Sequence, residues 1–337
     1  MTTAAIVGCG DVAVVHAETL AALNIPIVGI ADTDPAGRER AAQLLPGTPV
    51  FASHEELIAR TSPTVVHVTT PHHQHADVVC DLLERGIHVL QEKPLAHTLA
   101  DGERIAAAAA ASDAQCGVCF QNRYNAPIQA LKQALDAGEL GAVNGAYGSV
   151  IWARTPDYYD DRPWRGRRSA SGGGLLINQA IHTLDAMAWL LGEPDQVAGT
   201  IATLRYRDRI DVEDTASAWF RHPGGVTSTF AGSLTNETYR LVEIEVYGSE
   251  GTGVIRDGLE LNTGSGTPRR VPERRVRTSG RTYWGMSHQL LIQDFHQSIG
   301  SPERFWLGPE EALVSLRMVM AIYADADRGR PHQGETA

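Results

Sequence analysis

Short apolar runs alternate with stretches of helical periodicity along the first 120 or so residues. The helical stretches include AVVHAETLAAL, a segment from Gly37 to Leu45, HEELIAR, HADVVCDLLERG and LADGERIAAAAAAS. The apolar runs are AAIVGCG, PIVGIADTD, TVVHVTTP, HVLQEKP and QCGVCFQ. Strands that are apolar throughout and separated by helices are typical of a parallel sheet covered on both faces. The pattern predicts an α/β domain over residues 1–122.

The pattern changes after Arg123, where a helix, APIQALKQALDAG, leads into longer segments of alternating character. Helices are expected again at Met286–Ser298 and Pro309–Asp327. HPGG between two of the alternating segments is a hairpin signal. Residues 123–337 are therefore predicted to form an α+β domain with a large open, mainly antiparallel sheet, whose strands are GAYGSVIWAR, QVAGTIATLRYR, TASAWFRH, VTSTFAGSL and LVEIEVYGSEGTGVIRD.

Length, charge and cysteine usage narrow the possible functions. A chain of 337 residues is long for one core, which agrees with two domains. The net charge of -11 argues against nucleic-acid binding, which needs a basic surface. No run approaches 18 apolar residues, and the N-terminus has no signal-peptide pattern, so we expect a cytoplasmic protein without a membrane partner. Cys116 and Cys119 lie in a predicted strand, which does not favour a redox pair.

Gly8 and Gly10 directly follow the first predicted strand and open a helix, with Ala13 completing a GxGxxA turn. In such a turn the first glycine permits tight geometry, the second admits a pyrophosphate, and the small third residue allows close packing. Asp32 ends the second predicted strand, where a carboxylate accepts hydrogen bonds from ribose hydroxyls and repels a 2′-phosphate. The sequence predicts dinucleotide binding, with NAD favoured over NADP. Arg38 is the one nearby cation that we expect to offset Asp32.

A second motif joins Gly172, Gly173 and Gly174 to an apolar helix that carries polar side chains. Asn178, His182, Asp185 and Trp189 share one narrow stripe of that helix. A buried histidine held by hydrogen bonds to Asp185 or Asn178 is one interpretation. A catalytic histidine with an orienting partner is the other, and this segment alone does not decide between them.

Two further motifs complete a family pattern. Thr70-Pro71 leaves a predicted strand, with His75 four residues after the proline, and Glu92-Lys93-Pro94 ends the strand HVLQEKP. Together with the GxGxxA turn and the glycine-to-histidine helix, these motifs make residues 4 to about 328 resemble the glucose–fructose oxidoreductase/inositol dehydrogenase (Gfo/Idh/MocA) family. The resemblance implies a Rossmann domain, a second domain on a large open sheet, and a sugar or cyclitol bound between them.

The resemblance also implies roles for individual residues. Lys93 and His182 are expected to be catalytic, one as the cation beside the reacting oxygen and one as the acid/base. Family members often carry Asp four residues before this histidine. Asn178 stands there in this chain, so we expect it to position substrate, with Asp185 a partner of His182. The residues expected to contact the cofactor are Gly8, Gly10, Asp11, Val12, Asp32, Thr70, Pro71, His72, His75, Glu92, Lys93 and Gln121.

Substrate recognition is expected in Arg154–Ser171, where aromatic faces and several guanidinium groups occur together. The alternative is a solvated loop whose arginines offset Asp157, Asp160 and Asp161. No metal is expected, since no carboxylate completes a ligand set around the histidines after the third strand. The residues expected to bind substrate are Lys93, Arg123, Tyr158, Trp164, Arg165, Asn178 and His182.

The leading hypothesis is an NAD(P)-dependent oxidoreductase that transfers hydride to or from a secondary hydroxyl or keto group of a sugar, nucleotide sugar or cyclitol. A glycosidase that uses transient oxidation by NAD, and a non-catalytic NAD-responsive binding protein, remain alternatives. We also expect a homodimer or homotetramer formed through the C-terminal sheet, because large exposed apolar patches are rare on monomers.

Overall fold

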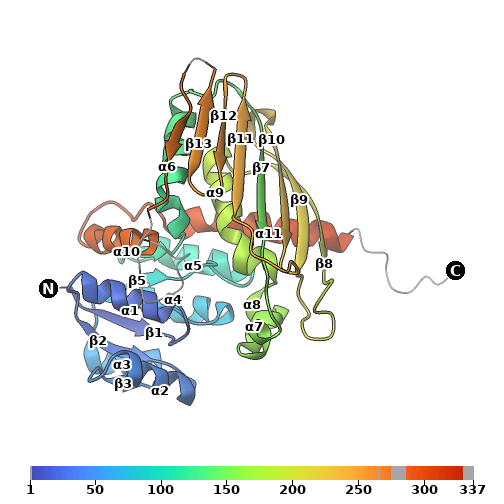
Figure 1. The fold of residues 1–337 in the computed structure, drawn as a ribbon. Helices are drawn as coiled ribbons and strands as arrows, with labels where there is room; N and C mark the ends of the chain where they lie inside the picture. The colour runs from blue at the N-terminus through green and yellow to red at the C-terminus, as the bar shows by residue number, and fades with distance from the viewer. Residues whose placement is uncertain (1, 265, 275–285, 329–337) are drawn as a thin grey trace. The chain divides into compact units, whose positions relative to one another are not determined.

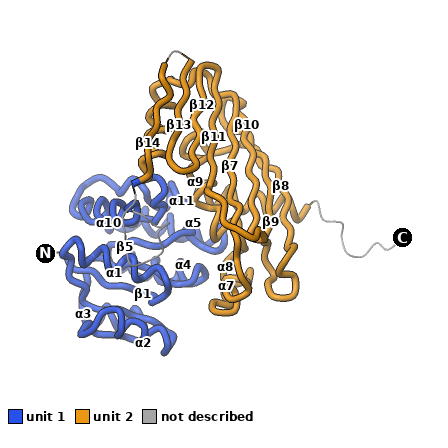
Figure 2. The backbone as a smooth tube through the Cα atoms, viewed as in Figure 1, with its two compact units in different colours: residues 1–124, 274–313 blue, residues 125–273, 314–337 orange. Residues whose placement is uncertain are grey.

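The computed structural model describes residues 2–264, 266–274 and 286–328 of the chain (Figure 1). The chain forms two compact units, shown in different colours in Figure 2. Unit 1 consists of Met1–Tyr124 and Arg274–Leu313, and unit 2 of Asn125–Glu273 and Val314–Ala337. Within the described ranges, no helix is both long enough and apolar enough to cross a membrane.

Unit 1 is built on a parallel sheet with strand order β3-β2-β1-β4-β5-β6. Because the strand order reverses between β1 and β4, the carboxyl ends of these two strands border a crevice, which is where open α/β sheets bind ligands. The strands are β1 (Ala4–Val7), β2 (Ile27–Ala31), β3 (Val50–Phe51), β4 (Val65–Val68), β5 (His88–Gln91) and β6 (Cys116–Val118). The helices between them are α1 (Ala13–Ala22), α2 (Pro35–Leu44), α3 (His54–Thr61), α4 (His75–Glu84) and α5 (Leu99–Ala111).

A segment from late in the sequence completes unit 1. Helix α10 (Ser287–Ser298) contacts α1 and the short 3₁₀ helix η2 (Gln121–Tyr124). A Cβ atom on Gly117 in β6 would lie 2.7 Å from the ring of Phe295, so only glycine lets α10 approach the strand this closely. The Val118 amide donates to the Leu307 carbonyl at 2.9 Å, which continues the hydrogen bonding beyond β6.

Unit 2 is built on an eight-stranded sheet with order β14-β13-β12-β11-β7-β10-β9-β8. Every neighbouring pair is antiparallel except β10 and β7, which are parallel. The mainly antiparallel open sheet predicted from sequence is thereby confirmed, as is the parallel sheet of unit 1. The strands are β7 (Val143–Ile151), β8 (Gln196–Ala202), β9 (Thr215–Arg221), β10 (Thr227–Ser233), β11 (Glu243–Gly248), β12 (Gly251–Ile255), β13 (Leu259–Thr263) and β14 (Arg269–Val271).

Helices α6 (Ala126–Asp136) and α9 (Ile181–Leu191) pack with this sheet around one apolar core. A Cβ on Gly148 of β7 would lie 2.4 Å from the sulfur of Met187, so this glycine allows α9 to lie close against the strand. Helix α11 (Pro309–Arg328) begins in unit 1 and ends in unit 2. The shorter helical elements of unit 2 are α7 (Asp157–Asp160), η3 (Pro163–Gly166), α8 (Arg168–Ser171), η4 (Leu176–Ala180) and η5 (Pro223–Gly225).

The structure differs from the sequence expectation at three places in unit 2. The long strand expected over LVEIEVYGSEGTGVIRD is a hairpin of β11 and β12, which pair antiparallel around Ser249 and Glu250. Strands β13 and β14 were not expected, because their sequences have few β-branched or aromatic residues. Finally, the helix expected after Gly174 begins with a π-helical segment, η4, before α9.

Candidate active site

The glycine turn after β1 has the geometry that its sequence predicts. Gly8 has φ +95°, and a Cβ there would lie 2.7 Å from the backbone of Thr69 and Thr70. A Cβ on Gly10, by contrast, would meet only the Thr69 carbonyl at 3.9 Å, so the space in front of this residue is open. Only glycine fits at the first position, while the second leaves the backbone accessible to a ligand.

Asp32 links the end of β2 to this turn. Its Oδ2 accepts from the Cys9 amide at 2.7 Å and its Oδ1 from the Asp34 amide at 2.9 Å. Arg38 donates to the Asp32 and Thr33 carbonyls rather than to the carboxylate. The expectation that Arg38 is the one nearby cation is wrong, because Arg40 also reaches the turn and donates to the Cys9 carbonyl at 3.3 Å.

His75 connects the segment after β4 to the segment after β5. Its ring is fully buried, with Nδ1 2.9 Å from the Pro94 carbonyl and Nε2 3.1 Å from the Thr70 carbonyl. Burial lowers the pKa of His75, which favours the neutral ring. A neutral ring donates from one nitrogen only, so Nε2 donates to the Thr70 carbonyl while Nδ1 accepts from the Gln91 side-chain amide at 3.2 Å. The ring thus shapes the loop that carries Thr70, and both of its nitrogens are engaged within unit 1. His72 is also buried, at the start of the 3₁₀ helix η1 (His72–Gln74).

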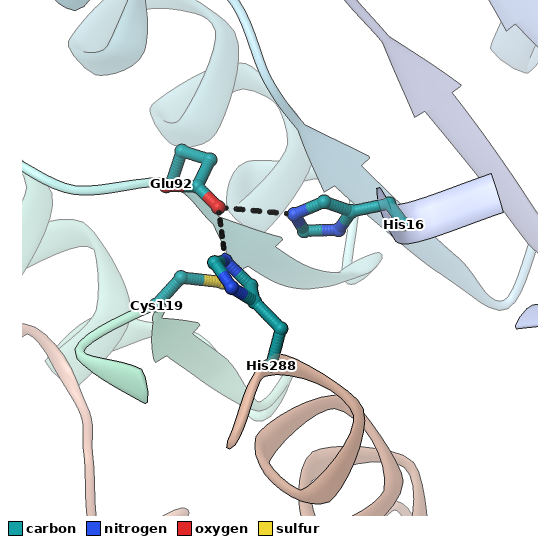
Figure 3. Close-up of side chains that lie close together, drawn as sticks. All are labelled: His16, Glu92, Cys119 and His288. Carbon is teal, nitrogen blue, oxygen red and sulfur yellow. Dashed lines mark hydrogen bonds and ion pairs between the residues drawn. The ribbon is translucent and has the colours of Figure 1, made fainter. Parts of the chain in front are cut away.

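Glu92 is the centre of a buried polar cluster drawn in Figure 3. Its Oε1 accepts from His16 Nε2 at 3.1 Å and from His288 Nε2 at 3.0 Å, and its Oε2 accepts from the Lys93 amide at 3.3 Å. The ligating atoms of His16, Glu92, Cys119 and His288 all lie within 4.8 Å of one another. These residue types can ligate a metal, but the hydrogen bonds to Glu92 already account for their arrangement.

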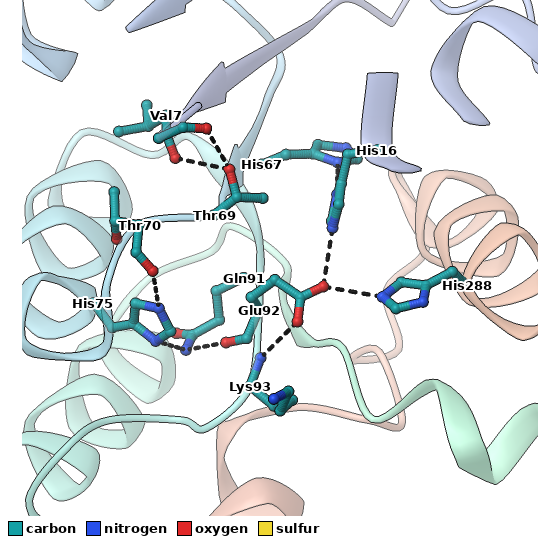
Figure 4. A network of polar contacts seen from close by, with 11 residues as sticks. Val7, His16, His67, Thr69, Thr70, His75, Gln91, Glu92, Lys93 and His288 are labelled. Carbon is teal, nitrogen blue, oxygen red and sulfur yellow. Dashed lines mark hydrogen bonds and ion pairs between the residues drawn. The ribbon is translucent and has the colours of Figure 1, made fainter. Parts of the chain in front are cut away.

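The ionised form of Glu92 is favoured inside the protein. Burial raises the pKa of this carboxyl, but the hydrogen bonds from His16 and His288 outweigh it and hold the pKa well below its usual value. Burial and the neighbouring Glu92 carboxylate keep the Cys119 thiol protonated by raising its pKa well above its usual value. The cluster therefore holds one negative charge next to the backbone of Lys93 (Figure 4).

A row of three histidines extends from this carboxylate. His16 Nδ1 lies 2.7 Å from His67 Nδ1, and His67 Nε2 lies 3.0 Å from His296 Nε2. Burial lowers the pKa of all three rings, that of His296 to about 4. Since neutral His16 donates to Glu92 through Nε2, it accepts from His67, which in turn accepts from His296. One arrangement of protons satisfies every contact in the row.

Several buried polar atoms in unit 1 have no hydrogen-bond partner among the described residues. Two of them, the hydroxyl oxygen of Thr70 and the amide oxygen of Gln121, follow strands of the parallel sheet. Buried polar groups are normally satisfied, so these atoms are suited to a polar ligand. Thr70 follows β4 and Gln121 follows β6, both at the carboxyl edge of the parallel sheet. With the open glycine turn and Asp32, this donor and acceptor set fits a dinucleotide.

In unit 2, the glycines before His182 permit two very close contacts. A Cβ on Gly173 would lie 1.9 Å from the Tyr323 hydroxyl, and a Cβ on Gly174 would lie 1.9 Å from the Glu213 carbonyl. The Glu213 carboxylate accepts from the Gly174 and Leu176 amides at 2.9 Å and from the Tyr323 hydroxyl at 2.8 Å. Glu213 thus satisfies free amides at the start of the helical segment. The sequence alone did not indicate Glu213, because it lies about 40 residues after the amides that it binds and no local pattern marks a contact over that distance.

The polar stripe of this helix is accessible at three of its four positions. Asn178, His182 and Trp189 are partly exposed, whereas Asp185 is buried. Gln179, in η4, is buried and donates to the Tyr158 hydroxyl at 2.6 Å. An accessible histidine on an otherwise buried helix can meet a ligand, which agrees with the catalytic interpretation of His182.

The segment Arg154–Ser171 divides into an inner and an outer part. Arg165 stacks on Tyr158, with its guanidinium carbon 4.5 Å from the ring centre, and also lies near Trp164. The outer Arg167 and Arg168 approach Asp211 and Asp327, both at 3.9 Å. Both side chains are exposed, and the aspartates that they approach lie outside the segment. Arg123, expected to bind substrate, is 1% exposed and pairs with Glu311 at 2.8 Å within unit 1.

Comparison with known proteins gives consistent matches. Residues 2–120 match the oxidoreductase family with an NAD-binding Rossmann fold, and residues 128–254 match the GFO/IDH/MocA C-terminal domain. The chain is 27% identical to the 1,5-anhydro-D-fructose reductase of Ensifer adhaerens, over 84% of each chain. It is 26% identical to the D-apiose dehydrogenase of Paraburkholderia graminis, over 97% of this chain and 88% of the relative.

A solved structure matches with both units. It is the WlbA dehydrogenase from Bordetella pertussis, in complex with NADH and UDP-GlcNAcA, with a TM-score of 0.84 and 26% identity over 97% of both chains. Nicotinamide cofactors thus occur with this fold, in agreement with the predicted cofactor, NAD.

Proposed function

Because the chain belongs to the Gfo/Idh/MocA family of NAD-binding oxidoreductases, we propose that it oxidises a secondary hydroxyl of a sugar, nucleotide sugar or cyclitol, or reduces the corresponding ketone. The dehydrogenases and reductases among its relatives support this substrate class. The observation that carries the proposal is the juxtaposition, in unit 1, of an open glycine turn, Asp32 and a fixed Glu92-Lys93 segment.

The cofactor site belongs to unit 1. Gly8, Gly10, Asp11 and Val12 would hold the pyrophosphate at the start of α1, and Asp32 the adenosine ribose. The buried side-chain oxygens of Thr70 and Gln121 would form hydrogen bonds with the nicotinamide half of the cofactor. When bound, NAD accepts or donates the hydride. The remaining chemistry falls to side chains of this chain.

Lys93 and His182 would handle the reacting hydroxyl. The Lys93 ammonium would stabilise negative charge that develops on the oxygen, and His182 would take the proton as the hydride leaves. Asn178, on the same accessible stripe as His182, would orient the substrate by hydrogen bonds. The buried cluster around Glu92 would keep Lys93 in place, because the carboxylate is fixed by two histidines and itself accepts from the Lys93 amide.

Absorbance at 340 nm tests the proposal directly. We expect NADH to accumulate when the protein and NAD⁺ are mixed with the correct member of a panel of sugars, cyclitols and nucleotide sugars. A panel without any NADH formation, and without reduction of the corresponding ketones by NADH, would contradict it. Cleavage of a glycoside without net NADH would instead identify a glycosidase that oxidises its substrate transiently.

A further inference from the structure

Arg154 is a buried cation of unit 2 that has no acidic partner among the residues described by the structure. It follows β7, is 9% exposed, and its amide donates to the Leu234 carbonyl at 3.2 Å. Within the described ranges it makes no ion pair, unlike the nearby Arg209, which pairs with Asp160 at 2.7 Å. Buried charges in proteins are normally paired, since removing an ion from water is costly. An unpaired buried guanidinium therefore needs an explanation.

Aromatic rings account for part of the environment of Arg154. Its guanidinium carbon lies 5.1 Å from the ring centre of Trp152, 4.8 Å from that of Tyr158 and 5.4 Å from that of Tyr239. Nη1 donates to the Ala153 carbonyl at 3.2 Å and to the Tyr239 hydroxyl, while Nε is buried and has no partner. Three rings hold the guanidinium in place and attract it, but they neither neutralise its charge nor satisfy Nε.

Contacts within unit 2 connect this cation to the helix that carries His182. The ring centre of Tyr158 lies 4.8 Å from the guanidinium carbon of Arg154 and 4.5 Å from that of Arg165. The hydroxyl of the same tyrosine accepts from Gln179 at 2.6 Å. Gln179 lies three residues before His182. Two positive groups are thus positioned through one ring next to the start of the proposed catalytic helix.

We propose that Arg154 binds an anionic group of the substrate, a carboxylate or a phosphate, with Arg165 beside it. The inference rests on the proposed function and narrows its substrate class to acidic, phosphorylated or nucleotide-linked sugars. The guanidinium fork matches the two oxygens of either group, and the rings restrict its orientation. An anion would supply the missing charge and the missing acceptor for Nε at once.

Equilibrium binding to the NADH-saturated protein tests this inference. Calorimetry would compare glucose, glucuronate, glucose 1-phosphate and UDP-glucose, which separates a carboxylate from a phosphate as the preferred group. We expect at least one anionic probe to bind tenfold or more tightly than glucose. Arg154→Gln should weaken binding of that probe by about 10- to 100-fold and leave glucose binding unchanged, because a hydrogen bond to a charged group is lost.

The controls separate a binding role from a structural one. Arg154→Lys keeps the charge without the fork and should lose less affinity than Arg154→Gln. Arg207→Gln, which removes an exposed arginine of the same unit that donates to the Thr203 carbonyl, should change nothing. Should the Arg154 variants fail to fold, inorganic phosphate should still compete with the anionic probe, but not with glucose, for the unmodified protein.

Two results would overturn the inference. One is equal affinity of the unmodified protein for glucose and for all three anionic probes. The other is an equal loss of glucose and anion binding in a folded Arg154→Gln variant. NADH formation from a neutral sugar alongside either result would leave the proposed function standing. Conversely, failure of every sugar to reduce NAD⁺ would remove the proposed function, while the binding preference would still be decided by calorimetry.

Discussion

His182 and Lys93 bear the chemistry of the proposed reaction, and replacing each should separate catalysis from folding. His182→Ala should leave the melting temperature and NAD binding nearly unchanged, because the side chain is partly exposed on its helix. Its turnover should fall by about 10²- to 10⁴-fold, the usual contribution of positioned proton transfer. Lys93→Ala should cost at least as much, since it removes a charge and a donor. Steady-state kinetics and thermal unfolding of both variants provide the check. A destabilised His182→Ala protein with normal kcat would refute the catalytic role.

Asp32 should determine which dinucleotide binds. Its carboxylate at the end of β2 repels a 2′-phosphate, so we expect tighter binding of NAD than of NADP. Asp32→Ser should narrow that difference by removing the repulsion, all the more because Arg40 also reaches the turn. Fluorescence titration with NADH and NADPH measures both affinities. The double variant Asp32→Ser/Arg40→Gln serves as the matched control. Because it lacks the Arg40 cation, it should bind NADPH more weakly than Asp32→Ser alone does. A preference for NADPH by the unmodified protein would contradict the assignment.

The buried histidines around Glu92 should make the fold sensitive to acid. The unfolded chain protonates these rings near their ordinary pKa of 6.5, whereas burial lowers the folded pKa of His296 to about 4. Unfolding therefore takes up protons as pH falls from 6.5 towards 4, and stability decreases over that window. The lowered pKa of Glu92 acts in the same direction, since its stabilising charge is lost at still lower pH. Urea midpoints measured between pH 7.5 and 4.5 should fall steadily, and His296→Gln should flatten the trend. A midpoint that is constant across this range would contradict the expectation.

The sequence predicted the individual residues of the site better than their partners. Gly8, Asp32 and the accessible stripe of Asn178 and His182 follow from local rules of turn and helix geometry, which operate over a few residues. His288 contacts Glu92 from 196 positions away in the chain, and no local pattern indicates that pairing. The assigned roles in catalysis and substrate binding stay predictions.

Among the elements, the helix that carries His182 depends on its two inner glycines. Gly174→Ala would place a Cβ 1.9 Å from the Glu213 carbonyl and displace the carboxylate that accepts from the first helical amides. We expect a loss of about 3 kcal/mol in unfolding free energy, at the upper end for overpacking. Gly264→Ala, which would place a Cβ 3.4 Å from the Glu250 carbonyl, should change stability by less than about 0.5 kcal/mol. Chemical denaturation compares the two variants. Equal stability of the two variants would mean that the close approach of Glu213 does not require glycine at position 174.

Elements with strong periodicity were predicted, and those defined by irregular backbone were not. The alternating β9 and β10 and the hairpin turn between them agree with the structure. The turn at Ser249–Glu250 was not predicted, because the alternation of apolar and polar residues continues from the strand before the turn into the strand after it. The π-helical η4 shares its composition with an ordinary helix, so its extra residue per turn leaves no sequence signal.

For the whole molecule, the class of each sheet was predictable but its strand order was not. A strand that is apolar throughout is buried on both faces, which indicates a parallel sheet. A strand in which apolar and polar residues alternate has one buried and one exposed face, so each strand's own sequence indicates the class of its sheet. The parallel pairing of β10 with β7 depends instead on partners about 80 residues apart. The sequence prediction placed one boundary at residues 122–123, and the structure adds that the segment Arg274–Leu313 also belongs to unit 1.

The sheet of unit 2 presents a face on which apolar side chains remain exposed. Along β9, Ala218 and Phe220 are buried while Trp219 between them is 37% exposed, and Tyr247 of β11 is 41% exposed. Thr229 pairs with both Trp219 and Tyr147, so the strands present these rings on the same face. Such a face is suited to association between copies of the chain.

We therefore expect a homodimer or homotetramer that forms through this sheet. Light scattering coupled to gel filtration at micromolar concentration should give a mass of two or four chains. Trp219→Lys should shift the mass towards one chain, because a charge would be buried in the interface. The matched variant Trp306→Lys, which changes a similarly exposed tryptophan in unit 1, should leave the assembly intact. A single-chain mass for the unmodified protein would rule out the assembly. If Trp219→Lys left the oligomer unchanged, the interface would not include this face of the sheet.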